Sequence, residues 1–188
     1  MQACSIPPII IMGVQGSGKT TIGDLLAKRL GVPLVDGDSL HSVENKKWMA
    51  SGRALSDDQR LPWLHKVGER LALGAGPGVV VACSALKHSY RDLLREHAPT
   101  MLTVYARGDI GLIQARITAR RHEYMPPSLL RTQFDDLEER RGDEPGVTVD
   151  ITNTPEQLVD RIMAVIAEDS YVESNDVQSN DVQPSCRP

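Results

Sequence analysis

Cysteines are few, basic residues are not in excess and apolar runs are short, and each of these absences excludes a class of protein. The three cysteines, Cys4, Cys83 and Cys186, form no C-x-x-C pair, so neither a disulfide framework nor a structural zinc site is indicated. Lys plus Arg total 21 against 25 Asp plus Glu, a net charge of −4. This balance argues against a general nucleic-acid-binding protein.

The apolar run at residues 9–14 is the longest one near the N-terminus, and it cannot span a bilayer. The first residues also lack the charged start and the long apolar region of a signal peptide. We therefore expect a soluble protein of a reducing compartment, the cytoplasm, with neither a membrane nor a nucleic acid as its partner.

Short apolar runs alternate with amphipathic segments along most of the 188 residues, a length that suits one domain. This alternation predicts an α/β fold with a parallel sheet buried on both faces and right-handed helical crossovers. Two helix starts carry capping boxes, Ser56 with Gln59 and Thr154 with Gln157. The predicted strands are 6–12, 33–36, 78–83, 101–106 and 147–151, and the predicted helices are 19–30, 43–51, 57–73, 87–96, 110–121, 128–138 and 155 to about 167.

The C-terminal residues 169–188 differ in composition from the rest of the chain. They are polar, and the five letters SNDVQ occur twice, at 174–178 and 179–183. Such a segment cannot bury enough apolar surface to fold. We expect one folded domain over 1–168 and a disordered tail over 169–188.

Residues 13–20 read GVQGSGKT and satisfy the pattern G-x-x-x-x-G-K-[ST] between a buried strand and an amphipathic helix. The glycines let backbone N–H groups turn inward around phosphate oxygens. Lys19 is expected to reach the β- and γ-phosphates and the Thr20 hydroxyl to bind Mg²⁺. The alternative is a glycine-rich turn without a ligand, but the flanking strand and helix favour the binding of ATP or GTP.

Asp36-Gly37-Asp38 follows the second predicted strand, at the edge where open α/β sheets bind ligands. Beside a nucleotide, one carboxylate can hold the water shell of a magnesium ion, and the other can accept a proton from a substrate hydroxyl. The alternative is an Asp-Gly turn that caps a helix.

Candidate donors then follow along the chain, and Arg60 and Lys87 are of most interest among them. The full set is His41, Lys46, Lys47, Arg53, Arg60 and Lys87. Arg60 and Lys87 lie next to predicted turns or strand ends. A small acidic substrate needs such donors, because Arg can hold a carboxylate with two hydrogen bonds. A solvated helix surface is the alternative for each of them.

Arg116, Arg120 and Arg121 precede a polar stretch that ends in prolines. In small kinases, a lid that carries arginines closes over the phosphates and stabilises charge on the transferred group. An exposed, arginine-rich helix face is the alternative. Trp48 and Trp63 are predicted to serve packing and not the stacking of a base.

These segments together resemble the gluconate kinases, a family of small P-loop kinases, from Ile9 to about Ala167. MGVQGSGKTT resembles the phosphate loop of the family, and VDGDSLHSVENKKWMASGRALSDDQRLPWL resembles its acid-rich acceptor segment. VVVACSALKHSYRDLLR is the most specific piece, and MPPSLLRTQFDDLE near the lid is the next. The phosphate loop alone does not separate this family from shikimate, adenylate or adenylylsulfate kinases. The CSALK segment and the D-G-D-x-x-H spacing together do.

The resemblance implies a three-layer P-loop NTPase sandwich with a five-stranded parallel sheet of order 2-3-1-4-5 and a helical lid over about 121–137. It implies ATP-dependent transfer to the 6-hydroxyl of D-gluconate, giving 6-phospho-D-gluconate for the pentose phosphate pathway. It also implies Mg²⁺ as the metal and a homodimer.

The resemblance further implies roles for individual residues. Asp38 is the expected base or hydroxyl orienter, Thr20 and Asp36 are the expected Mg²⁺ residues, and the lid arginines are expected to face the phosphates. The implied sets are catalytic residues Lys19, Asp38, Arg116 and Arg120; ATP contacts Gly13, Gln15, Gly16, Ser17, Gly18, Lys19, Thr20 and Thr21; and gluconate contacts Asp38, His41, Arg60 and Lys87.

Two other functions stay open at the level of sequence. One is a kinase for another small hydroxy acid such as shikimate, which substrate competition would distinguish and against which CSALK argues. The other is a nucleotide-binding regulatory protein without acceptor chemistry, which would bind ATP and transfer no phosphoryl group. The intact DGD segment and the lid arginines argue against it.

Overall fold

A parallel sheet forms the centre of the molecule in the computed structural model, which describes residues 6–119 and 127–178. The five strands lie in the order β2-β3-β1-β4-β5, so the predicted order is confirmed. Ile10 of the central strand lies opposite Val81 on one side and Thr103 on the other. The strands are β1 Pro8–Met12, β2 Leu34–Asp36, β3 Val79–Ala82, β4 Leu102–Arg107 and β5 Gly146–Asp150.

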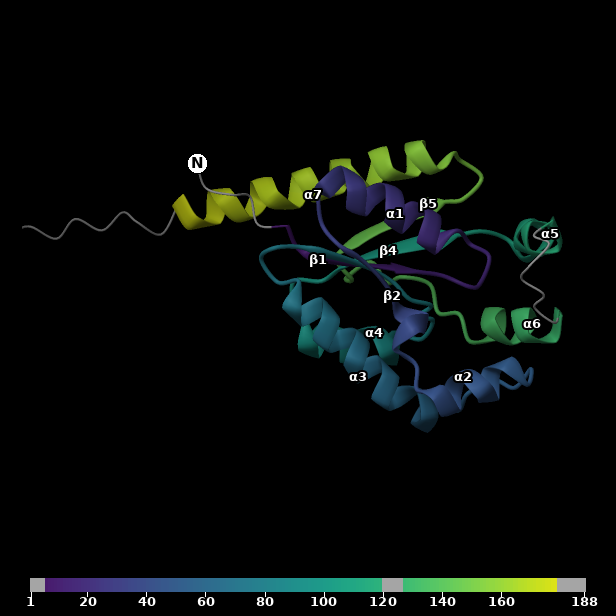
Figure 1. Cartoon of the computed structure of the whole chain (residues 1–188). Coiled ribbons are helices and arrows are strands. Elements are labelled where there is room, and N and C mark those ends of the chain that lie inside the picture. The colour runs from purple at the N-terminus through teal and green to yellow at the C-terminus, as the bar shows by residue number, and fades with distance from the viewer. Residues whose placement is uncertain (1–5, 120–126, 179–188) are drawn as a thin grey trace, which may run out of the picture.

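Helices cover both faces of this sheet, which confirms the three-layer arrangement (Figure 1). The helices are α1 Lys19–Leu30, the 3-10 helix η1 Gly37–Leu40, α2 Val43–Ala50, α3 Asp57–Leu73, α4 His88–His97, α5 Ile110–Ala119, α6 Pro127–Asp135 and α7 Pro155–Gln178. Helices α1 and α7 pack on one face, and α3 and α4 pack on the other. Because side chains alternate along a strand, Ile9 and Ile11 join the first core, while Ile10 and Met12 join the second.

The helix ends follow their sequence signals closely. At α3, the Gln59 N–H donates to Ser56 Oγ and the Ser56 N–H donates to Gln59 Oε1, which confirms the capping box. The same exchange joins Thr154 and Gln157 before α7. Helix α7 continues past its predicted end near 167 to Gln178, because neither glycine nor proline interrupts residues 156–178. The remaining part of the predicted tail, 179–188, lies outside the described residues.

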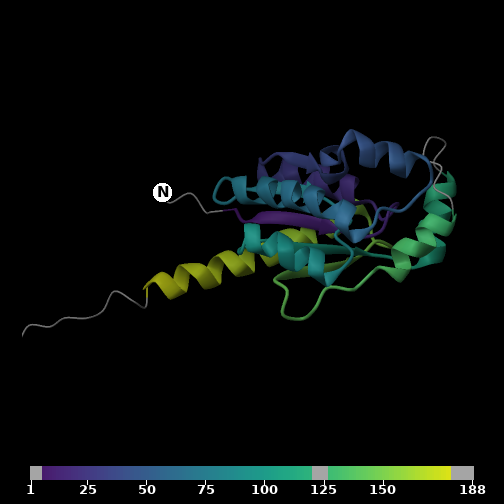
Figure 2. The same cartoon turned by 90° about the horizontal axis from the view of Figure 1, so that it is seen from below.

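Helices α2, α5 and α6 gather at one end of the sheet, the end at which β1 runs into α1 (Figures 1 and 2). The segment 120–126, which includes Arg120 and Arg121, lies outside the described residues, so the predicted lid is described only from α6 onward. Over the described residues, no helix combines the length and the apolar character needed to cross a membrane.

Candidate functional site

The loop between β1 and α1 has two glycines at positions where a side chain would clash with neighbouring atoms. Gly13 has φ +146°, and a Cβ there would lie 2.8 Å from Ser17 Oγ and 2.9 Å from the Ala106 carbonyl oxygen. Gly16 has φ +82°, and a Cβ there would lie 2.7 Å from Ile117 Cγ1. Both glycines are therefore required by the turn itself. Gly13 is the first glycine of the phosphate-loop pattern, and Gly16 stands at a position where the pattern admits any residue.

A cavity of about 280 Å³ opens at this loop. Lys19 lies in its wall, with Nζ 3.0 Å from the Val14 carbonyl oxygen. The cavity brings most of the predicted ATP contacts together with the two aspartates that follow β2. Its lining residues are Gln15, Gly16, Gly18, Lys19, Thr20, Thr21, Asp36, Asp38 and Ala82.

Asp36 has a structural role in addition to its place in this cavity. Its Oδ1 accepts a hydrogen bond from the Asp38 N–H at 3.0 Å and so caps η1. Asp36 therefore caps a helix, as the alternative interpretation expected. The same carboxylate also lines the cavity together with Thr20. A hydroxyl and a carboxylate are oxygen donors of the kind that Mg²⁺ prefers, and Mg²⁺ completes its shell with water and substrate phosphates. The residues present fit that ion.

Across the described ranges, no three His, Cys, Asp or Glu side chains gather at one point. A metal held partly by nucleotide phosphates needs fewer protein ligands.

A second cavity, of about 140 Å³, adjoins the first and shares Gln15, Lys19 and Asp38 with it. Its other walls come from elements that are far apart in the sequence. The full lining is Gln15, Lys19, Asp38, His41, Met49, Leu55, Arg60, Trp63, Ser84 and Gln133. Because Lys19 and Asp38 face both spaces, a group could pass from one cavity to the other beside them. We call this second space the acceptor pocket.

His41 is held in the acceptor pocket by an aromatic stack. Its ring lies 4.2 Å from that of Trp63, at 14° between planes, and Trp63 Nε1 donates to the Gly37 carbonyl oxygen at 2.7 Å. Burial first, and then the charges of Lys46 and Arg60, lowers the pKa of His41 to about 4. His41 is therefore neutral near pH 7, and its buried Nδ1 has no partner among the described residues. It can exchange a hydrogen bond with a hydroxyl without adding charge.

Arg60 enters the pocket from α3 and is fixed from behind. Its Nη1 donates to the Tyr90 hydroxyl at 2.8 Å and lies 3.5 Å from Asp136 Oδ2. The Tyr90 hydroxyl in turn donates to Asp57 at 2.5 Å. The guanidinium is thus oriented before any substrate arrives.

Lys87 does not line the acceptor pocket. Its Nζ contacts both oxygens of Asp57, at 2.9 and 3.0 Å, and lies 3.8 Å from Asp136. The hydrogen bond to Asp57 raises the pKa of Lys87, and hydrogen bonds from Tyr90 and then Lys87 lower the pKa of Asp57. Contact between Lys87 and gluconate stays a prediction, which requires that these bonds be exchanged.

The segment between β3 and α4 is shaped by a buried arginine that the sequence reasoning missed. Ala85 has φ +39°, an uncommon conformation for a residue with a side chain. Arg91, fully buried, donates at 3.0 Å to the carbonyl oxygens of Ala85 and Leu86, and its Nε pairs with Glu144 at 2.7 Å. A basic residue in an amphipathic helix carries no sequence signal for such a position.

The same segment supplies the backbone contact behind the phosphate loop. The Gly13 N–H donates to the Ser84 carbonyl oxygen at 3.2 Å. Next to Ser84, burial raises the pKa of the Cys83 thiol to about 12, so this cysteine stays protonated and serves packing.

Arg116 lies on the other side of the phosphate loop. Its Nη2 donates to the Ile151 carbonyl oxygen at 2.6 Å, and it lines a separate cavity of about 280 Å³ with Ser17, Thr21 and Asn153. In this conformation it is not among the residues that line the acceptor pocket. Its predicted contact with the phosphates stays a prediction, and that of Arg120 lies outside the described residues.

The sequence is similar to those of known small kinases. The family model described as shikimate kinase matches residues 15–167. The thermoresistant gluconokinase of Escherichia coli (strain K12) is 39% identical over 84% of this chain and 91% of its own length. A gluconokinase of Arabidopsis thaliana is 38% identical over 85% of this chain and 92% of its own.

The structure is also similar to solved structures of a gluconokinase and of a shikimate kinase. The crystal structure of a gluconokinase from Sinorhizobium meliloti 1021 matches with a TM-score of 0.83 and 42% identity, covering 93% of this chain and 98% of that one. A shikimate kinase from Aquifex aeolicus matches with a TM-score of 0.62 at 17% identity, which is a likeness of fold alone.

The parallel sheet, the phosphate loop and the adjoining acceptor pocket define a small P-loop kinase, a nucleotide-binding phosphotransferase. At this level the fold is shared with the shikimate kinases. The extent of identity to curated and solved gluconokinases is decisive for the family, and this chain belongs to the gluconokinase family.

Proposed function

We propose that the chain transfers the γ-phosphoryl group of ATP to the 6-hydroxyl of D-gluconate, giving 6-phospho-D-gluconate and ADP. One observation carries the proposal: the phosphate-loop cavity and the acceptor pocket share Lys19 and Asp38. Membership of the gluconokinase family supports gluconate as the acceptor.

The nucleotide binds along the phosphate loop in this proposal. Backbone N–H groups and Lys19 hold the phosphates, with the positive end of α1 behind them. The base occupies the cavity beside Arg116 and Asn153, where a planar guanidinium suits stacking on an aromatic ring. Thr20 and Asp36 hold Mg²⁺, which when bound neutralises charge on the phosphate oxygens.

Gluconate binds in the acceptor pocket with its reactive hydroxyl at Asp38. Arg60, already oriented by Tyr90 and Asp136, receives the carboxylate end, since a guanidinium binds carboxylates bidentately. Neutral His41 exchanges a hydrogen bond with one of the sugar hydroxyls.

Transfer then follows from placement and charge. The bond from the γ-phosphorus to the ADP oxygen breaks, a bond to the 6-oxygen of gluconate forms, and the hydroxyl proton passes to Asp38. Lys19 stabilises the charge on the transferring group, and Arg120 is proposed to do so from the lid. Positioning of the two substrates supplies most of the remaining rate.

We further propose that the protein works as a homodimer in the cytoplasm and supplies the pentose phosphate pathway. The family relationship supports these proposals. Native mass determination in solution would test the first of them directly.

The function is tested by coupled ATP turnover with D-gluconate, beside shikimate, glycerate and no acceptor. ADP release that depends on gluconate and is absent with the others is the expected result. Turnover with shikimate alone would contradict the acceptor while leaving the kinase mechanism. ATP binding without turnover of any acceptor would favour a regulatory protein.

A further inference from the structure

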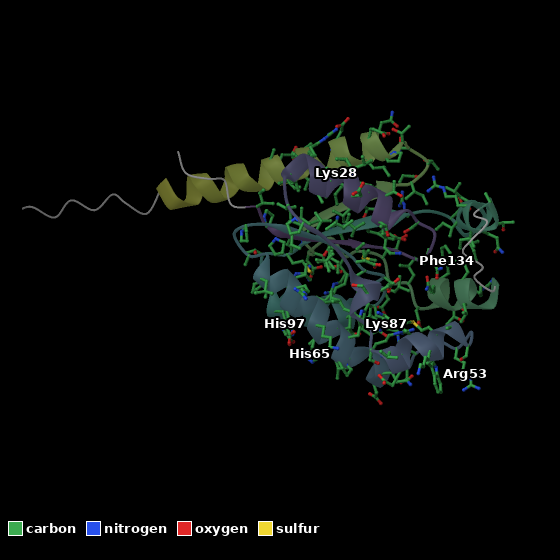
Figure 3. All side chains as sticks on the ribbon, in the orientation of Figure 1. Lys28, Arg53, His65, Lys87, His97 and Phe134 are labelled. Atoms are coloured by element: carbon green, nitrogen blue, oxygen red, sulfur yellow. The ribbon has the colours of Figure 1, made fainter. Side chains whose placement is uncertain are left out.

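A side chain of helix α6 is hydrogen-bonded to the phosphate loop. Gln133 Oε1 accepts a hydrogen bond from the backbone N–H of Gln15 at 2.7 Å, across 118 residues of sequence. The helix itself is fixed by Leu130, which is buried, and by Phe134, which packs against the sheet core (Figure 3). The amide of Gln133 is therefore carried on an anchored element.

The chemistry of the contact fixes which way the amide faces. A backbone N–H can only donate, so the oxygen of Gln133 must be the atom turned toward Gln15. The NH₂ group is then directed elsewhere, and among the described residues no acceptor contacts it. Gln133 lines the acceptor pocket and also a neighbouring cavity of about 380 Å³, and Arg60 lines both as well.

Besides Gln133, the acceptor pocket is lined by three charged side chains and by the neutral polar side chains of Gln15, His41 and Ser84. Lys19, Asp38 and Arg60 carry charge, whereas a polyhydroxy acid also presents several neutral hydroxyls. An amide NH₂ can donate to a hydroxyl oxygen without adding charge to the site.

We propose, on the basis of the proposed function, that Gln133 is a further acceptor-binding residue of this kinase. Its oxygen is held by the Gln15 N–H, and its NH₂ group donates a hydrogen bond to a hydroxyl of gluconate. The bond to the phosphate loop thereby sets the position of the acceptor relative to the ATP cradle. Recognition of the acceptor and placement of α6 depend on the same amide.

Two substitutions distinguish the role of the amide oxygen of Gln133 from that of its NH₂ group. Gln133→Glu keeps an oxygen for the Gln15 N–H, removes the NH₂ donor and places a negative charge near an anionic substrate. Gln133→Met keeps the length of the side chain and removes both hydrogen-bonding ends. Gln114→Met on α5, an exposed glutamine that lines none of the three cavities at the site, is the matched control.

The measurement is the KM for gluconate, the KM for ATP and kcat for each variant, together with thermal unfolding. For Gln133→Met we expect the KM for gluconate to rise about five- to tenfold, the size of one lost neutral hydrogen bond. For Gln133→Glu we expect a larger rise, because like charges repel. The KM for ATP should change by less than about twofold, a small free energy beside that of one hydrogen bond. Gln114→Met should match the wild type in both KM values and in kcat.

The alternative outcomes are distinct. An unchanged KM for gluconate in both variants, with or without a lower unfolding temperature, would overturn this inference and leave a structural role. An equal rise in both KM values would assign Gln133 to the phosphate loop alone. A wild-type protein that binds ATP but does not turn over gluconate would overturn the proposed function, and this inference with it.

Discussion

The nucleotide side and the acceptor side of the site are built in different ways. The nucleotide side is one continuous loop, residues 13–21, in which a side chain at Gly13 or Gly16 would clash with its neighbours. The acceptor side is assembled from side chains of η1, α2, α3, α6 and the segment after β3. Backbone N–H groups bind phosphate in any kinase of this fold, whereas the choice of acceptor depends on side chains that can vary independently.

This difference explains how one fold serves several acceptors. The shikimate kinase structure shares the fold at 17% identity, and a phosphate loop makes the same demands on sequence in each such kinase. Under the proposed function, discrimination between hydroxy acids depends on residues that line the acceptor pocket and not the phosphate-loop cavity, such as His41, Arg60 and Gln133. Substitutions on the two sides should accordingly separate effects on ATP from effects on gluconate.

The largest effect is expected on the nucleotide side, from Lys19→Ala. Lys19 faces both cavities, and loss of a charge-stabilising donor of this kind lowers rates by about 10³-fold or more. We expect kcat/KM to fall by at least that factor in the coupled assay. Lys28→Ala on the same helix, where Lys28 is exposed and paired with Asp24 (Figure 3), is the control. Near-normal kcat in Lys19→Ala would contradict the assignment.

Asp38→Asn should have the next largest effect, and it should lower the rate of transfer without abolishing ATP binding. The variant keeps the shape of the side chain but cannot accept the hydroxyl proton, so kcat should fall by roughly 10²-fold or more. ATP binding, measured by titration calorimetry, should persist, because the phosphate loop is untouched. Asp24→Asn on α1 controls for the loss of a carboxylate at the surface. A rate equal to that of the wild type would move the base to another residue.

Most of the fold and the nucleotide side are predictable because their signals are local. The strand pattern, the two capping boxes and the GVQGSGKT loop each follow from neighbouring residues, and the structure has them where they are expected. The ends of two helices differ from the prediction. Helix α6 ends at Asp135 and not at 138, and α7 continues to Gln178, since polar residues without glycine or proline contain no stop signal.

The acceptor side is predictable only in part because its geometry depends on distant partners. His41 and Arg60 are recognisable in the sequence as charged or polar candidates. The stacking of His41 on Trp63 and the hydrogen bond from Arg60 to Tyr90 cannot be predicted from the sequence around either residue. Lys87 has an equally plausible sequence context, yet it pairs with Asp57 outside the pocket. Only the packing of α3 against α4, together with the position of Asp136, separates these cases.

A smaller and more selective effect is expected from Arg60→Lys. Lysine keeps the charge but not the planar, two-pronged geometry that holds a carboxylate. We expect the KM for gluconate to rise about tenfold, a loss of the order of one charged hydrogen bond, while the KM for ATP stays close to that of the wild type. Arg70→Lys, exposed near the end of the same helix, is the control. A parallel rise in the KM for ATP would remove the distinction between the two sides.

The smallest effect concerns stability and pH, and it tests the acceptor side without substrate. The folded-state pKa of His41 is about 4, below its ordinary 6.5, so the unfolded chain binds more protons between these values. By linkage, the contribution of the neutral, buried imidazole is fully present above pH 6.5 and is lost as the pH falls toward 4.

Urea unfolding of the wild type and of His41→Gln at pH 7.5 and pH 5 measures this contribution. The free energy of unfolding of the wild type should fall more steeply between the two pH values than that of His41→Gln, because glutamine does not titrate. Equal slopes would mean that His41 is not held neutral by its surroundings. A hydrogen bond from a neutral imidazole to gluconate would then lose its physical basis, and the acceptor side would rest on charged contacts and the Gln133 amide.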